Sequence, residues 1–92
     1  MKSIVTKSNS TFDLLKDYID TRIILSAVSW DIYNNIKDKF NFLKKLVDTF
    51  PNDGNDSDLK VVTQNYLNAK KIVKDFEEHI SYGLVTLYEY PV

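Results

Sequence analysis

The fold is decided by the sequence LKVVTQNYLNAKKIVKDFEEHI, residues 59–80, in which apolar residues recur in steps of three and four. These positions are Leu59, Val62, Tyr66, Ala69, Val73, Phe76 and Ile80. Such spacing places them on one face of an α-helix, which must be buried against another element. Asp56 or Ser57 can cap the start of this helix and Gly83 fits the position after its end. The sequence therefore predicts a long helix over residues 57–82.

A similar apolar seam runs through the first half of the chain. It consists of Phe12, Leu15, Ile19, Tyr33, Ile36, Phe40, Leu43, Val47 and Phe50. Pro51 ends this pattern, and the polar residues 52–56 that follow are typical of a turn. Because so short a connection makes consecutive helices pack antiparallel, we predict a helical hairpin made of residues 22–50 and 57–82.

The seam is interrupted in its middle, where Arg22, Ser26 and Ser29 occupy seam positions. The apolar residues move there to Ile23, Ile24, Leu25, Ala27, Val28 and Trp30. Two interpretations are open. Either the helix breaks or kinks near residues 20–23, or one helix over 12–50, about 58 Å long, is covered on several faces by a second copy of the chain. We favour the break, which leaves residues 10–21 as a short helix or extension.

Both ends of the chain are predicted to be extended. Residues 1–9 contain a β-branched run and are expected to form an arm, while residues 84–92 are β-branched and aromatic and are expected to form a tail or strand. In a hairpin these ends emerge together and can pair as a ribbon, either within one chain or between two chains. The predicted fold class is all-α: an antiparallel helical hairpin with a short or kinked N-terminal helix and an extended C-terminal tail, packed as an oligomeric helical bundle.

Composition narrows the classes of function. The chain has 92 residues, enough for one domain, and its net charge of −1 gives no strong attraction to nucleic acid or to an anionic membrane. It has no cysteine, which removes thiolate nucleophiles and disulfides. The longest fully apolar run, residues 23–25, is too short to span a bilayer. We expect a cytoplasmic protein, and the richness in Asn, Lys, Ile and Asp suits a phage or a bacterium with an AT-rich genome.

Catalytic and metal-binding signatures are weak. His79 is the only histidine, and a neighbouring carboxylate such as Glu78 could orient it as a general base, but a solvated helix histidine is the simpler interpretation. The acidic residues of 51–58 are oxygen ligands of the kind Ca²⁺ takes, yet their spacing is that of a turn and a helix cap. We therefore predict no catalytic, cofactor-binding or metal-binding residue.

Binding residues are easier to nominate. Tyrosine and tryptophan are frequent at the centres of protein interfaces, and apolar residues at the interrupted seam lack an obvious partner within the chain. We therefore predict a partner-binding role for Ile24, Trp30, Tyr88 and Tyr90. A possible anion-binding role falls to the hairpin lysines Lys37, Lys44, Lys70 and Lys74.

The function predicted from these features is a non-enzymatic binding protein that acts by protein–protein interaction, an inhibitor or immunity-type protein of phage or bacterial origin. A homo-oligomer is also expected, because a domain this small buries little surface alone. Two alternatives stay open: an oligomeric binder of a small anionic ligand or nucleic acid through the lysines, and a secretion-type chaperone or adaptor.

Overall fold

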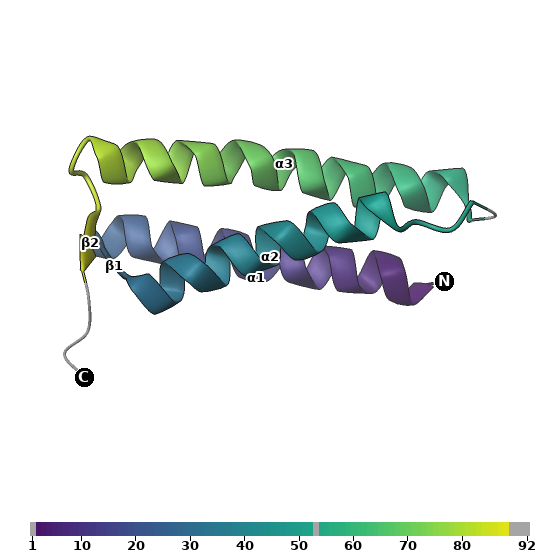
Figure 1. Cartoon of the computed structure of the whole chain (residues 1–92), viewed down its shortest axis with the longest axis horizontal. Coiled ribbons are helices and arrows are strands. Elements are labelled where there is room, and N and C mark those ends of the chain that lie inside the picture. The colour runs from purple at the N-terminus through teal and green to yellow at the C-terminus, as the bar shows by residue number, and fades with distance from the viewer. Residues whose placement is uncertain (1, 53, 89–92) are drawn as a thin grey trace.

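Three helices packed side by side, with a short parallel ribbon at one end, make up the described part of the chain (Figure 1). The computed structural model describes residues 2–52 and 54–88. The elements are α1 (Lys2–Leu25), β1 (Ala27–Ser29), α2 (Trp30–Asp48), α3 (Asp56–Ser81) and β2 (Thr86–Tyr88). The prediction of an all-α fold is confirmed at the level of three helices packed together. Within the described ranges, no helix is both long enough and apolar enough to cross a membrane.

The third helix, α3, buries the seam that the sequence predicts. Val62, Ala69 and Phe76 are fully buried within it. Its N-cap is Asn55, one residue earlier than predicted, whose side chain accepts a hydrogen bond from the backbone N–H of Ser57 at 2.7 Å. At the other end Gly83 has a φ of 78°, and the N–H groups of residues 83 and 84 return to carbonyls of the last turn. This is the glycine-dependent helix end that the sequence predicts.

The second helix, α2, begins at an N-cap serine and runs antiparallel to α3. The Ser29 hydroxyl accepts a hydrogen bond from the Ile32 N–H at 3.2 Å. Ile36 and Leu43 are fully buried. Two aromatic pairs join the helices, Tyr33 with Phe76 and Phe40 with Tyr66. These pairs fix the register of α2 on α3, because they join the two facing seams at two separate points, about two turns apart on α2.

The first helix, α1, corrects the prediction for the N-terminal part of the chain. Residues 1–9 were predicted to be an extended arm and 10–21 a short helix, but Lys2–Leu25 form one helix. Its first turns are held by α3: the Asn65 amide donates to the Ser8 hydroxyl at 2.9 Å and to the Asn9 side-chain oxygen at 2.8 Å. Since Ser8 is fully buried, this contact extends the helix–helix interface to the start of the chain.

The break between α1 and α2 also lies later than predicted, at Ser26 rather than near residues 20–23. The buried face of α1 continues one turn beyond Ile19, because Ile23 is half-buried against the core. The chain then turns at Ser26, which has a φ of 57°, in the left-handed region. The predicted helix over 22–50 is therefore wrong in its first eight residues, which complete α1 and form β1.

The ribbon pairs the C-terminal segment with the α1–α2 connection. Val28 of β1 is opposite Leu87 of β2, and the Thr86 N–H donates to the Ser26 carbonyl at 3.1 Å. The predicted pairing of the tail with an N-terminal arm of the same chain is wrong, because β2 and the start of α1 lie at opposite ends of the bundle (Figure 1). The unpredicted length of α1 causes this, because the helix runs along the bundle and carries residue 2 away from the ribbon. Residues 89–92 of the predicted tail lie outside the described residues.

Candidate functional site

Large apolar side chains are exposed at the ribbon end of the bundle. They are Ile24 (81% exposed), Tyr82 (80%), Leu84 (59%), Leu25 (58%) and Trp30 (43%). We call these residues the end surface. Each occupies a place where a helix stops or starts: the end of α1, the start of α2, and the segment directly after α3. Because these segments meet at one end of the molecule, residues far apart in the sequence contribute to the same region (Figure 1).

The other exposed large apolar residues are arranged differently. They are Leu14, Phe42, Val61 and Leu67. They are spread over the lengths of the three helices, and single exposed apolar side chains of this kind are ordinary in proteins. The concentration at the ribbon end is the feature that marks a candidate interaction site.

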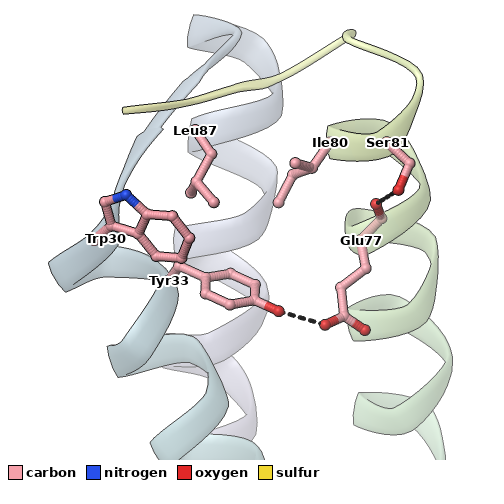
Figure 2. A pocket seen from close by; sticks show the side chains of 6 residues that line it. All are labelled: Trp30, Tyr33, Glu77, Ile80, Ser81 and Leu87. Carbon is pink, nitrogen blue, oxygen red and sulfur yellow. Dashed lines mark hydrogen bonds between the residues drawn. The ribbon is translucent and has the colours of Figure 1, made fainter. Parts of the chain in front are cut away.

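A cleft of about 300 Å³ opens beside Trp30. It is lined by Trp30 and Tyr33 of α2, by Glu77, Ile80 and Ser81 at the end of α3, and by Leu87 of β2. Figure 2 shows the two aromatic rings on one side, the Glu77 carboxylate opposite them, and Leu87 and Ile80 projecting from above. We call it the ribbon cleft. Its walls are mainly apolar, and it contains one carboxylate.

The carboxylate of Glu77 is held in place from α2. The Tyr33 hydroxyl donates to Glu77 Oε2, and the Lys37 ammonium lies 3.3 Å from the same oxygen. Both contacts use Oε2, so neither engages Oε1. The Trp30 and Tyr33 rings meet edge to face with centroids 6.2 Å apart. The ribbon cleft therefore has a fixed acidic group and an ordered aromatic pair before any ligand arrives.

The environment of Tyr33 changes its acidity. The pKa of Tyr33 rises from 10.0 to about 12. Burial of the phenol is the largest cause, and the hydrogen bond to Glu77 and the negative charge of Glu77 raise the pKa further. All three causes favour the neutral phenol over the phenolate. Tyr33 consequently stays protonated, and able to donate to Glu77, throughout the neutral range.

This shift predicts a late component in the tyrosine titration. Followed by ultraviolet absorbance of the phenolate, the native chain should show one group that ionises near pH 12, absent from Tyr33→Phe. Because the folded-state pKa lies above the ordinary value, the stability linked to Tyr33 is fully present below pH 10 and is lost as pH rises toward 12. In Glu77→Gln the component should move to lower pH, since the negative charge is gone. An unchanged titration in Tyr33→Phe would contradict the assignment.

A second, smaller cleft of about 200 Å³ lies between α1 and α3, and His79 is part of its lining. His79 Nδ1 donates to the backbone carbonyl of Asp75 at 2.7 Å, a contact within its own helix. The Glu78 side chain is exposed, and the structure shows no hydrogen bond between it and His79. In residues 2–52 and 54–88, no group of three or more His, Asp or Glu side chains is placed to hold a metal ion. Asp20 and Asp75 also line this cleft, but among the described residues the hydrogen bond of the His79 ring goes to the Asp75 backbone carbonyl and not to a carboxylate.

The residues nominated from the sequence are distributed unevenly. Ile24 and Trp30 both belong to the end surface. Tyr88 is in β2, but its side chain lies outside the described residues, as does all of Tyr90. The hairpin lysines Lys37, Lys44, Lys70 and Lys74 line neither cleft. Lys37 is paired with Glu77, and the other three are exposed on α2 and α3.

Sequence reasoning missed several members of this region, namely Leu25, Tyr82, Leu84 and Glu77. The seam gave a signal for Glu77, because it lies one turn beyond Val73 on the side of α3 that faces α2. Tyr82 and Leu84 flank the helix-ending Gly83, where apolar residues are easily taken for ordinary helix-end packing.

Comparisons with protein-family models, with curated protein sequences and with solved structures all find no match. The candidate function therefore rests on the geometry of the ribbon end.

Proposed function

We propose that this chain is a non-enzymatic binding protein whose end surface contacts a protein partner, and that it belongs to the class of inhibitors or immunity-type proteins. The observation that carries this proposal is the concentration of exposed Ile24, Leu25, Trp30, Tyr82 and Leu84 at one end. Burying apolar surface is the main favourable term in protein association, at roughly 25 cal/mol per Å². Tryptophan and tyrosine supply much of the binding energy at such interfaces.

The rigidity of the surroundings supports this proposal. Beneath the end surface Val28 and Val85 are both 1% exposed, so the ribbon is docked on the helix core. Gly83 closes α3 with a defined turn that carries Tyr82 and Leu84 on either side. A surface fixed in this way loses little conformational entropy on binding, which favours affinity.

The anion-binding alternative is less well supported. Lys37 lies 3.3 Å from Glu77, which offsets its charge. Lys44, Lys70 and Lys74 are on exposed helix faces and line neither of the two clefts described above. A second copy of the chain is the other candidate occupant of the end surface, as the expectation of an oligomer suggests.

The test is a quantitative capture experiment with matched variants. The chain is immobilised in three forms: wild type, Ile24→Asp/Tyr82→Ser in the end surface, and the control Leu14→Asp/Leu67→Ser on the helix faces. A lysate of the cells that encode the chain is passed over each, and retained proteins are quantified by mass spectrometry. We expect a protein held by wild type and control that falls at least about 10-fold on the end-surface variant.

Each outcome decides the proposal. Equal retention by all three forms would show that the end surface is not the contact site. A wild-type dimer that becomes a monomer in Ile24→Asp/Tyr82→Ser, measured by light scattering, would assign the surface to a second copy instead. If the captured partner is an enzyme, its rate with and without the chain separates an inhibitor or immunity protein from an adaptor or chaperone.

A further inference from the structure

The ribbon cleft combines apolar walls with one carboxylate, which favours a ligand that has both an apolar part and a positive charge. Its walls include the indole of Trp30 and the aliphatic side chains of Ile80 and Leu87, and it holds the carboxylate of Glu77 (Figure 2). The carboxylate faces the aromatic pair across the opening. A ligand that fills this cleft must therefore offer an apolar stem to the walls and a positive charge to the carboxylate.

Lysine and arginine side chains have this composition, with a flexible hydrocarbon stem and a cationic head. We propose that the ribbon cleft receives a lysine or arginine side chain of the protein partner that covers the end surface. The inference rests on the proposed function, because Trp30 belongs both to the end surface and to the cleft. The stem packs against Ile80 and Leu87 while the head reaches Glu77.

The atoms of the cleft accommodate such a head. Tyr33 and Lys37 both bind Glu77 Oε2, so an incoming ammonium or guanidinium is directed to Oε1. The Trp30 ring, 43% exposed, can also attract the cation through its π face, as tryptophan does most strongly among the aromatic residues. Tyr33 stays a neutral donor near pH 7, so it keeps the carboxylate oriented without adding charge.

The charge of this end of the molecule is complementary to a basic partner. The segments 19–37 and 74–88 carry five acidic side chains against three basic ones. The acidic ones are Asp20, Asp31, Asp75, Glu77 and Glu78, and the basic ones are Arg22, Lys37 and Lys74. A net negative end attracts a cationic side chain and repels an anionic one, which also separates this proposal from anion binding.

The ion pair between Lys37 and Glu77 leads to a prediction that is specific to this proposal. The Lys37 ammonium already lies 3.3 Å from Glu77, where it competes with any incoming cation for the same carboxylate. Both side chains of this pair are partly solvated, at 37% and 40% exposed, so the contact is weak enough to be displaced. Removing Lys37 should therefore strengthen the binding of a cation, whereas removing Glu77's charge should weaken it.

The experiment uses the whole chain and two small probes of equal stem length. N-acetyl-lysine methylamide carries the ammonium, and N-acetyl-norleucine methylamide lacks it. Binding is followed by ¹H–¹⁵N NMR, where the indole N–H of Trp30 gives a unique signal because the chain has one tryptophan. For ligands of this size we expect the lysine probe to shift this signal with a dissociation constant of about 1 mM. The norleucine probe should bind at least about 3-fold more weakly.

Three variants complete the test. Glu77→Gln keeps the shape of the side chain and an acceptor for Tyr33, and it should weaken the lysine probe about 3–5-fold without changing the norleucine probe. Lys37→Met should strengthen the lysine probe about 2-fold. Lys71→Met, the same charge change at an exposed position of α3 that does not line the cleft, should leave the affinity within about 1.5-fold of wild type.

Equal affinity for the two probes, or no effect of Glu77→Gln, would overturn the proposal and define the cleft as an apolar pocket only. No saturable shift of the Trp30 signal would show that it takes no such side chain. Either result can coexist with capture of a partner that depends on Ile24 and Tyr82, so a failure here is distinguishable from a failure of the proposed function.

Discussion

Replacing Phe76 by alanine is expected to lower the free energy of unfolding by about 3–5 kcal/mol, as truncation of a buried phenylalanine does when the cavity cannot collapse. Phe76 is fully buried in the core. It lines the cleft of His79, and its ring packs against that of Tyr33, which lines the ribbon cleft. For a chain of this length the whole stability is about 5–14 kcal/mol. The variant should therefore be only marginally folded, which urea unfolding followed by circular dichroism will show.

The matched control is Phe42→Ala, the same change on α2 at a side chain that is 38% exposed. We expect it to cost about 1–2 kcal/mol, clearly less than Phe76→Ala, because part of the Phe42 side chain is already in water and its removal leaves no enclosed cavity. Equal losses in the two variants would contradict the burial of Phe76. Since Phe76 also supports the ring of Tyr33, its loss should broaden the Trp30 indole signal even under conditions where the variant is folded.

The parts of the fold that follow from the sequence are those with an uninterrupted seam. In α3 the steps of three and four predict the buried residues Val62, Ala69, Val73 and Phe76, and Gly83 predicts the end. This works because a helix that packs along its whole length needs an apolar residue on every turn of one face. The seam of α2 is equally informative from Tyr33 onward, where it meets its partner at Ile36 and Leu43.

The N-terminal part of α1 differs from the prediction because its β-branched run, Ile4, Val5 and Thr6, favours an extended arm when judged by local propensity alone. The heptad-like seam begins only at Phe12, so it does not extend the predicted helix over residues 2–9. In the structure Ser8 takes the buried position and Asn65 of α3 supplies its partner. Such a contact depends on a residue far away in the sequence, and neither residue has a pattern that indicates the other.

The candidate site was predicted only in part for a related reason. Ile24 and Trp30 were nominated because they fall where the seam is interrupted, and the structure places both on the end surface. The interruption differs from the predicted kink: the apolar run is exposed at Ile24 and Leu25, where α1 ends, and it is buried at Val28, where β1 packs into the helix core. Parallel pairing between 27–29 and 86–88 is a non-local contact that local periodicity does not encode.

Replacing Val85 by aspartate is expected to lower the free energy of unfolding by about 3 kcal/mol and to detach β2 from the bundle. Val85 is 1% exposed, and a carboxylate at that position cannot be buried without a partner. The segment can escape this cost by undocking, so the loss is limited to the free energy of docking. That free energy is about 1.5–3 kcal/mol for burying Val85, with a further contribution from other apolar residues of the ribbon in the same core cluster. Urea unfolding measures the loss, and hydrogen exchange at the Thr86 amide, bonded to the Ser26 carbonyl, reports the undocking.

The control for this variant is Thr86→Asp, the same new charge one residue later at an exposed position. It should cost less than about 1 kcal/mol and leave amide exchange nearly unchanged, because its carboxylate stays in water. Comparable losses in both variants would show that any new charge in the ribbon is destabilising, and that the burial of Val85 is not the cause. Since Leu87 forms one wall of the ribbon cleft, Val85→Asp should also abolish the response of Trp30 to the lysine probe while Thr86→Asp preserves it. The docked strand is thus what joins the stability of this end of the bundle to the binding activity that we propose for it.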